Sequence, residues 1–430
     1  MSRRKAYWPT IIAAAALFGA IAVGANAAGA FVEPNVQVLQ EFDGTAGPGT
    51  DFGWAVSELG DVDGDHVEDA IVGEPFTDGG STYVYSGRTG SLLYRFDGAS
   101  GDYNGFAMAD ARDVNGDRVH DILVGAPGNG AGHVDLYSGK TGELLHRFIG
   151  ASAGDAFGWS VSSAGDVDRD HQADVLIGAS QGFSGAGSGY ASIYSGRTYE
   201  LIRTLNGDRV GDQFGSGAAS SRDVNRDHVP DQIVGARDAG NGARGQVYVY
   251  SGETGERLLT IDASSHGDSF GSFFVAGVGD VNRDGTPDIY AADYYDSTNG
   301  SDPTNFTASG RAAVYSGRNG HELLSWVGPD ADAGLGPGRG AGDVNHDGHE
   351  DLIVGSYTSN AGASNAGRVQ IFSGADGSVL RTITSKATNE ELGFDAVGLG
   401  DTNQDGALDE LVSAANGNRV YIIAGARPKP

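Results

Sequence analysis

Short apolar runs separated by glycine-rich and polar turns occupy most of the chain. Residues 122–126 are continuously apolar, residues 133–137 alternate between apolar and polar positions, and residues 106–109 and 144–148 are two further short runs. Runs of this length, bounded by turn residues and lacking helical periodicity, predict β-strands. The stretch 106–148 therefore predicts a unit of four short strands.

An aspartate pattern, D-x-[DN]-x-D-x-x-x-D, repeats along the chain in step with these strands. Its seven copies start 52, 53, 57, 57, 63 and 58 residues apart, at Asp61, Asp113, Asp166, Asp223, Asp280, Asp343 and Asp401. A four-stranded sheet of this size cannot bury both faces alone, whereas sheets packed face to face in a ring bury one another. We therefore predict an all-β fold, a seven-bladed β-propeller of four-stranded antiparallel blades.

The two ends of the chain complement each other. Residues 419–423 match the third strand of a repeat, and no fourth strand follows them, whereas residues 36–44 match the fourth strand at 92–98. We predict that residues 36–42 pair with 419–424 and complete the last blade, which removes exposed sheet edges. Residues 28–430 then form a single propeller domain.

The N-terminus has the features of a signal peptide over residues 1–27. Arg3, Arg4 and Lys5 precede an apolar stretch at 11–23, and Ala-Asn-Ala at 25–27 fits a cleavage site. We expect a secreted, periplasmic or cell-surface protein; an uncleaved anchor is the alternative. No other apolar stretch approaches the ~18 residues of a spanning helix, so no membrane association is expected after cleavage.

Charge and cysteine content limit the partners and the kind of protein that can be expected. The chain carries a net charge of −29 and no cysteine. Nucleic acid is excluded as a partner because it requires cationic contacts to phosphate. Absence of cysteine in an exported chain indicates a bacterial protein that does not depend on disulfides. We expect a monomer.

The aspartate loops have the composition of calcium sites. Oxygen ligands at positions 1, 3 and 5, a carbonyl at position 7 and a later carboxylate are typical of calcium loops, and oxygen donors favour Ca²⁺ over zinc. We predict up to seven structural Ca²⁺ ions. The predicted ligands, loop by loop, are Asp61, Asp63, Asp65, Val67, Asp69; Asp113, Asn115, Asp117, Val119, Asp121; Asp166, Asp168, Asp170, Gln172, Asp174; Asp223, Asn225, Asp227, Val229, Asp231; Asp280, Asn282, Asp284, Thr286, Asp288; Asp343, Asn345, Asp347, His349, Asp351; and Asp401, Asn403, Asp405, Ala407, Asp409.

Position 6 of such a loop normally holds glycine, as in Gly285, Gly348 and Gly406. Histidine at this position in loops one, three and four tolerates the left-handed conformation at some cost, and Arg118 in loop two is the least favourable residue. Loop two is therefore the weakest candidate, and a metal-free Asx-turn is the alternative for it.

Further motifs resemble a known family. Phe-Gly pairs stand at 52–53, 157–158, 214–215 and 270–271, and Gly-Ala-Pro stands at 125–127. Over residues 36–425 the chain resembles the FG-GAP repeats of the integrin α-chain head, although copies two, six and seven depart from Phe-Gly. The resemblance implies a propeller with shortened calcium loops ending at position 9, and adhesion by analogy.

Function is expected on the face that carries the variable connections, since recognition usually resides in surface loops. The longest connection, 293–310, carries Tyr294, Tyr295 and Phe306, which either bind a ligand or tuck onto the blade. Trp54 and Trp159 either pack on inner strands or stack sugars in the central channel.

The leading interpretation is a binding or adhesion module for an extracellular glycan or protein. The alternative is a carbohydrate-active enzyme or lectin-like module on the same scaffold. No catalytic motif is recognised, so no enzyme activity and no catalytic residue is predicted.

Overall fold

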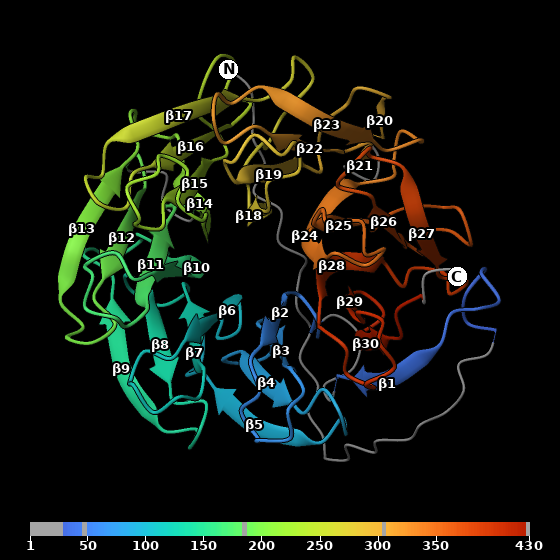
Figure 1. Ribbon diagram of the computed structural model, residues 1–430, viewed down its shortest axis with the longest axis horizontal. Coiled ribbons are helices and arrows are strands. Elements are labelled where there is room, and N and C mark those ends of the chain that lie inside the picture. Colours follow the sequence, from blue (N-terminus) through green and yellow to red (C-terminus); the bar gives the residue numbers. More distant parts are fainter. Residues whose placement is uncertain (1–28, 45–49, 183–186, 303–306, 427–430) are drawn as a thin grey trace.

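The computed structural model describes residues 29–44, 50–182, 187–302, 307–426. Seven four-stranded antiparallel sheets form a closed ring (Figure 1), which confirms the predicted seven-bladed propeller. No described residue forms a helix, and none therefore provides an apolar helical segment long enough to cross a membrane.

Each blade comprises four strands, ordered from the central channel outwards. In this order the strands are β2 (Val56–Leu59), β3 (Asp69–Glu74), β4 (Ser81–Tyr85) and β5 (Leu92–Asp97) in blade 1; β6 (Ala107–Arg112), β7 (Asp121–Ala126), β8 (His133–Tyr137) and β9 (Leu144–Ile149) in blade 2; β10 (Phe157–Gly165), β11 (Asp174–Ala179), β12 (Tyr190–Tyr194) and β13 (Leu201–Asn206) in blade 3; β14 (Phe214–Ser220), β15 (Gln232–Ala236), β16 (Gln246–Tyr250) and β17 (Arg257–Asp262) in blade 4; β18 (Val275–Val278), β19 (Asp288–Asp293), β22 (Arg311–Tyr315) and β23 (Glu322–Val327) in blade 5; β24 (Leu335–Gly342), β25 (Asp351–Ser356), β26 (Arg368–Phe372) and β27 (Val379–Thr384) in blade 6; and β28 (Leu392–Gly398), β29 (Glu410–Ala414), β30 (Arg419–Ile423) and β1 (Val38–Asp43) in blade 7. A small hairpin, β20 (Ser301–Asp302) and β21 (Thr307–Ala308), lies in the β19–β22 connection.

Burial follows the position of a strand within its blade. The second strands, such as β3, β7 and β11, are buried along their whole length, because neighbouring blades cover both of their faces. Outer strands such as β5 and β9 leave their ends exposed and bury one residue near the end, Phe96 or Phe148. A continuous apolar run for the second strand is the pattern expected of a strand buried on both faces.

Adjacent blades approach each other at pairs of glycines. A Cβ on Gly73 at the end of β3 would overlap the carbonyl oxygen of Gly105 in the next blade. The same contact joins Gly125 to Gly158, and it recurs between blades 3 and 4, 4 and 5, and 6 and 7. These positions need glycine because the backbones meet there without room for a side chain.

The ring is closed by the N-terminal strand. β1 pairs antiparallel with β30, with Phe42 opposite Val420 and Asp43 opposite Arg419, so the predicted completion of blade 7 is confirmed. Phe42 is buried and stacks on Tyr85 of blade 1 with ring centroids 4.2 Å apart. Figure 1 shows β1 beside β30 at the join. The predicted signal peptide, residues 1–27, lies outside the described residues.

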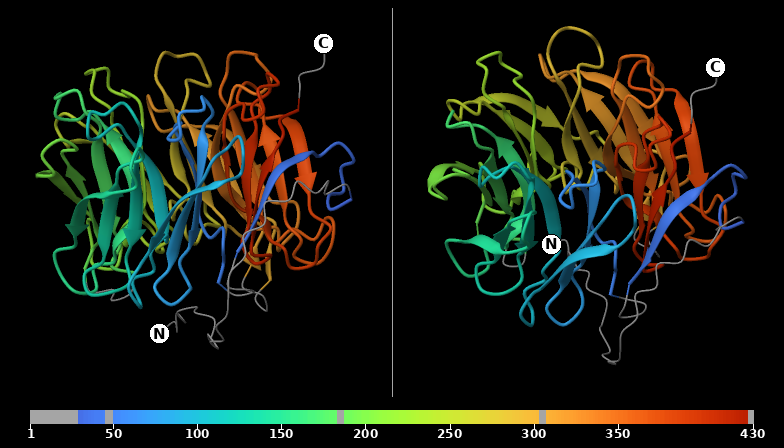
Figure 2. Two further views of the ribbon diagram at one scale, coloured as in Figure 1. Left: turned by 90° about the horizontal axis from the view of Figure 1, so that it is seen from below. Right: turned by 60° about the horizontal axis from the view of Figure 1, so that its bottom comes forward.

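The strands run between the two faces of the ring, as the side views in Figure 2 show. Turns joining first to second and third to fourth strands lie on one face, called here the aspartate face. Connections from second to third strands and from one blade to the next lie on the opposite face, called here the variable face.

Replacing Phe42 should destabilise the whole ring. The Phe42→Ala variant removes a buried ring from the closing strand, which typically costs about 3–5 kcal/mol of unfolding free energy. Denaturant unfolding measures this loss. Gln37→Ala, an exposed position just before the same strand, should unfold like the parent protein. Equal stability of Phe42→Ala and the parent would contradict the closing role of β1.

Candidate functional site: aspartate loops and central cavity

The aspartate loops are shaped by hydrogen bonds to the first aspartate. In loop one, Asp61 Oδ1 accepts the N–H of Asp65 at 3.1 Å, and Oδ2 accepts the N–H of His66 at 2.7 Å. The equivalent two bonds are present in the other six loops. Each chain segment is thereby folded around one carboxylate.

The last aspartate of every loop anchors it to the segment that follows the third strand of the blade, which is a turn in blades 1 to 6. Asp69 Oδ2 accepts the N–H of Val62 at 2.9 Å, and Oδ1 accepts the N–H of Gly87 in the turn between the third and fourth strands at 3.1 Å. The same two acceptor roles recur in all six other blades. All seven of these carboxylates are fully buried: Asp69, Asp121, Asp174, Asp231, Asp288, Asp351 and Asp409.

Burial acts on the ionisation of these acids. It raises the pKa of Asp69 from 3.8 to about 7, although the N–H groups of Val62 and Gly87 pull the pKa down. The pKa values rise to about 6 for four counterparts for the same reason: Asp121, Asp174, Asp231 and Asp288. A cation beside such a carboxylate favours the charged form and so opposes this shift.

Oxygens of three acids come together in each of the two loops that carry four acids. In loop one, oxygens of Asp61, Asp63 and Asp65 lie within 4.8 Å of one another. In loop three, the same holds for Asp166, Asp168 and Asp174. The other five loops place asparagine at position 3 and share the backbone hydrogen bonds of loops one and three. An all-oxygen donor set of this kind fits a hard divalent cation.

Two positions of each loop adopt the left-handed backbone conformation. Position 6 has φ of 68° in His66 and 71° in Arg118, close to the 80° of Gly285. Arg118 therefore takes the same turn as glycine. Position 4 is also left-handed, at 64° in Arg169 and 68° in Arg226. The sequence reasoning missed position 4, although Gly64 and Gly116 stand there in loops one and two.

The left-handed residue at position 4 also links successive loops. The guanidinium of Arg169 donates to the carbonyl of Asp227 in loop four at 3.2 Å. Arg226 donates to the carbonyl of Asp284 at 3.3 Å, and Arg283 reaches loop six in the same way. Loops three to six thus form a chain of neighbours across the aspartate face.

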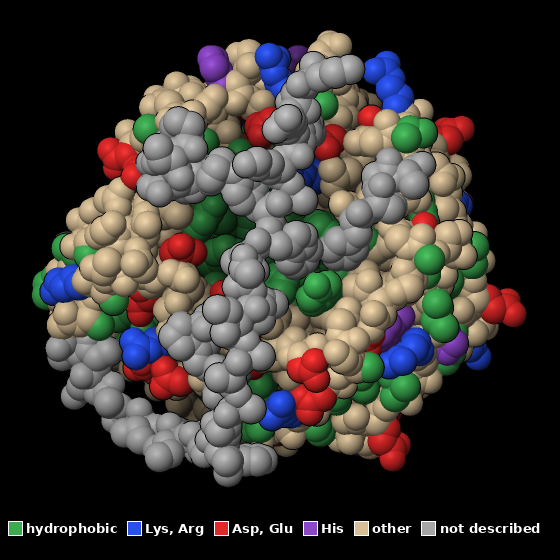
Figure 3. Space-filling model, turned by 180° about the vertical axis from the view of Figure 1, so that it is seen from behind, with side chains coloured by type: hydrophobic (Ala, Val, Ile, Leu, Met, Phe, Trp, Pro, Cys, Tyr) green, Lys and Arg blue, Asp and Glu red, His purple; other side chains and the backbone are tan. Residues whose placement is uncertain are grey.

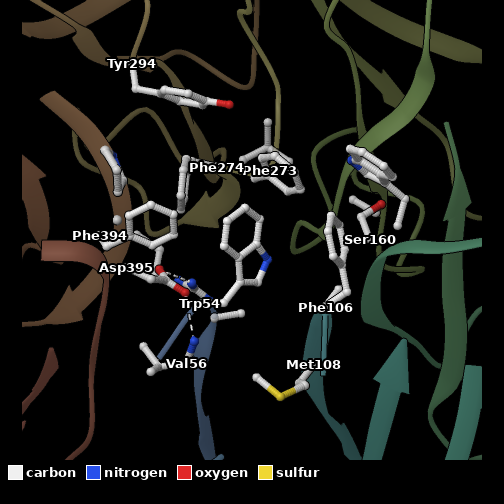
Figure 4. A pocket seen from close by; sticks show the side chains of 18 of the residues that line it. Trp54, Val56, Phe106, Met108, Ser160, Phe273, Phe274, Tyr294, Phe394 and Asp395 are labelled. Carbon is white, nitrogen blue, oxygen red and sulfur yellow. Dashed lines mark hydrogen bonds and ion pairs between the residues drawn. The ribbon is translucent and has the colours of Figure 1, made fainter. Parts of the chain in front are cut away.

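A cavity of about 350 Å³ lies at the centre of the ring. Four of its aromatic residues stand at one repeat position, the residue after the Phe-Gly glycine or its counterpart: Trp54, Phe106, Trp159 and Phe394. Figure 4 shows Trp54 between Phe394 and Phe106. Both tryptophans therefore line the central cavity, where they also pack on neighbouring aromatic rings.

The structure shows where the counterpart of the Phe-Gly pair lies in blade 2, whose sequence lacks this pair. Asn104 bridges Gly80 of the preceding blade, just as Phe157 bridges Gly132. Asn104-Gly105 is therefore the counterpart of Phe-Gly in blade 2, one of the copies that depart from this pair in sequence. Phe106 follows Gly105 and therefore stands at the repeat position that lines the cavity.

Other aromatic residues complete the wall. Phe273 of blade 5 stacks on Trp159 with centroids 5.7 Å apart. Tyr294 and Tyr295, from the long 293–310 connection, are half-buried and line the cavity. Tyr294 contacts Phe274 edge-on at 6.0 Å. Phe306 lies outside the described residues, so its predicted role stays open.

An ion pair forms one side of the cavity. Arg339 Nη2 lies 2.5 Å from Asp395 Oδ1, and Asp395 Oδ2 accepts the N–H of Val56 at 3.0 Å. The Asp395 side chain is 4% exposed and the Arg339 side chain 28% exposed. Part of the Arg339 side chain therefore remains accessible, while the Asp395 carboxylate is enclosed by its partners.

Comparison with known proteins agrees with this geometry. The FG-GAP repeat family matches residues 157–194 and 340–372, which span the first three strands of blade 3 and most of those of blade 6, with aspartate loops three and six. The chain contains FG-GAP repeats.

Integrin α-chains are among the proteins to which the chain is similar. It is 32% identical to integrin alpha-V of Gallus gallus over 206 residues, covering 44% of this chain and 20% of that protein. It is 26% identical to integrin alpha-8 of Gallus gallus over 291 residues, covering 63% and 26%. Integrin alpha-3 of Cricetulus griseus is 33% identical over 152 residues, covering 30% and 14%. The chain thus spans about a quarter or less of the length of these relatives.

Burial also acts on two acids in connections of the variable face, Asp51 and Glu391. Burial, reinforced by the charge of Asp51, raises the pKa of Glu391 from 4.5 to about 7. Burial raises the pKa of Asp51 to about 6. The folded state therefore holds protons that the unfolded chain releases, and its stability falls as pH rises from about 4.5 to 7.

Replacing Glu391 with glutamine should remove the part of this pH dependence that Glu391 contributes. At pH 8 Glu391→Gln should be more stable than the parent by about 1–2 kcal/mol, after allowance for partial exposure, and near pH 4 the two should be equal. Denaturant unfolding across this pH range measures the difference. The exposed Glu143→Gln substitution should show no such trend. A constant difference between Glu391→Gln and the parent would contradict the assignment.

Proposed function

We propose that this protein is a secreted, calcium-stabilised propeller that binds an extracellular glycan or protein as an adhesion module. The observation that carries the proposal is the aromatic cavity at the centre of the ring. It is walled by Trp54, Phe106, Trp159 and Phe394 at the start of the inner strands, on the side of the variable face. Figure 3 shows hydrophobic side chains gathered around the centre of the ring seen from behind.

Calcium is proposed to hold the aspartate loops. The ion would be bound by the carboxylates and amides at positions 1, 3 and 5, the carbonyl at position 7 and the buried aspartate at position 9, in up to seven copies. Bound there, Ca²⁺ supplies positive charge that offsets the clustered carboxylates. The position-9 aspartates then connect the ion to the segment that follows the third strand, because each already accepts an N–H from that segment.

Binding is favoured over hydrolysis of a glycan. The acid that lines the cavity, Asp395, is paired with Arg339 and accepts the N–H of Val56, so its oxygens are committed to protein partners. A glycosidase requires one carboxyl that donates a proton and another that acts as base or nucleophile. The enzyme and the lectin-like module are distinguished by the array experiment described below, which detects both binding and cleavage.

Removing calcium should destabilise the fold. A site at 100-fold excess of ion over its Kd adds about 2.7 kcal/mol of stability when the unfolded chain does not bind. Treatment with EDTA should therefore lower the melting temperature by many degrees, and restored Ca²⁺ should reverse the change. An unchanged melting temperature after confirmed loss of metal would contradict a structural role.

A pair of loop-one variants tests the ligand assignment. Asp65→Ala should lower the calcium content measured by elemental analysis by one ion per chain. Asp63→Asn should retain it, because asparagine stands at the same position in five other loops. If Asp65→Ala binds as many ions as the parent, loop one is not a calcium site.

Binding can be tested directly on arrays of glycans and of extracellular proteins, with Ca²⁺ and with EDTA. We expect saturable binding to a defined subset of immobilised ligands, weakened when the fold loses calcium. Shortened glycan products in solution would instead support the enzyme alternative. Absence of binding to either array, with a folded and calcium-loaded protein, would count against an adhesion module.

A further inference from the structure

The central cavity combines flat aromatic walls with a narrow polar side. Trp54, Phe273, Phe394 and Tyr357 are only half-buried, so their rings remain accessible within the cavity. Several of these rings also meet each other, for example Trp54 and Phe394 at 5.2 Å. The walls are therefore rigid and ordered before any guest enters, which lowers the entropic cost of binding.

The charge of the cavity argues against an ionic guest. Arg339 and Asp395 form a close pair and largely cancel each other at the polar side. A cationic guest that is attracted to the aromatic faces would meet the guanidinium of Arg339. An anionic guest that approaches Arg339 would meet the carboxylate of Asp395. A neutral guest avoids both costs.

The hydrogen-bonding groups indicate what the neutral guest carries. A guanidinium has five N–H donors. Arg339 donates from Nη2 to Asp395, and its side chain is 28% exposed. The hydroxyl groups of Tyr294, Tyr295 and Tyr357 add polar atoms to residues that line the same cavity. A fitting guest therefore has an apolar face for the rings and hydroxyl oxygens at its rim.

We propose that the cavity binds one neutral pyranose ring, the terminal sugar of a glycan, stacked on Trp54 and hydrogen-bonded to Arg339. A pyranose presents C–H groups on one face and hydroxyls around its edge. The volume of about 350 Å³ lies at the lower end of the range for small-molecule sites, which suits a single ring rather than an extended chain. This inference deepens the proposed function and rests on it.

Titration of the full chain with simple methyl glycosides tests the proposal. Methyl glycosides of glucose, galactose, mannose and N-acetylglucosamine are the probes, and tetramethylammonium and benzoate represent cationic and anionic guests. Binding is measured by calorimetry and by saturation-transfer NMR. At least one glycoside should bind with a Kd around 1 mM, as expected for a small ligand, and its ring C–H protons should show the transfer.

Two tryptophan variants locate the site. Trp54→Leu keeps an apolar side chain but removes the flat ring, and should weaken glycoside binding about tenfold. Trp326→Phe is the matched control, because Trp326 packs on Phe372 between the outer parts of blades 5 and 6; it should bind like the parent. Melting temperatures of both variants establish that each is folded.

Each of the following three outcomes would overturn the proposal. Saturable binding of tetramethylammonium or benzoate without any glycoside would make the cavity an ionic site. Equal glycoside affinity of Trp54→Leu and the parent would place sugar recognition elsewhere on the propeller. Absence of binding by every probe would exclude a small neutral guest. In these cases the array experiment still decides whether the protein is an adhesion module.

Discussion

Contact between glycine backbones of neighbouring blades is the constraint on which the ring depends. At pairs such as Gly73 with Gly105 and Gly125 with Gly158, one blade's carbonyl occupies the place of the other's side chain. This approach brings the fully buried second strands against the next blade along their length. Where another residue replaces one glycine of a pair, that residue is small: Ala292 faces Gly336, and Ser413 faces Gly53. The glycines of both family motifs are thus explained by the same close packing.

The residue that follows this glycine decides what the centre of the ring contains. It is aromatic in blades 1, 2, 3 and 7, but it is Ser216, Ser272 and Pro337 in blades 4, 5 and 6. Sevenfold repetition therefore supplies equivalent positions, and sequence differences at one of them produce an asymmetric cavity. Packing and recognition share these side chains, since Trp159 is buried against Phe106 while it lines the cavity.

Repetition made most of the architecture predictable from sequence. Seven aspartate loops and the matching strand patterns at 36–44 and 92–98 were enough to predict the blade count and the closing strand. The candidate site was harder to predict from the sequence. The counterpart of Phe-Gly in blade 2 was hidden because Asn104 replaces phenylalanine, and side chains from all seven blades meet in the cavity only through the tertiary structure. Left-handed geometry at position 4 was obscured because arginine occupies it in loops three to five.

Pairing of β1 with β30 joins residues such as Asp43 and Arg419, which are separated by nearly the whole sequence. Each other blade consists of strands that follow one another, so it can assemble from local contacts, whereas the seventh needs both extremities at once. Loop closure over such a distance is slow because its entropy is lost before the contacts form. Assembly of this protein should accordingly be limited by a late, long-range step. Until that step occurs, two unpaired strand edges remain open to other chains.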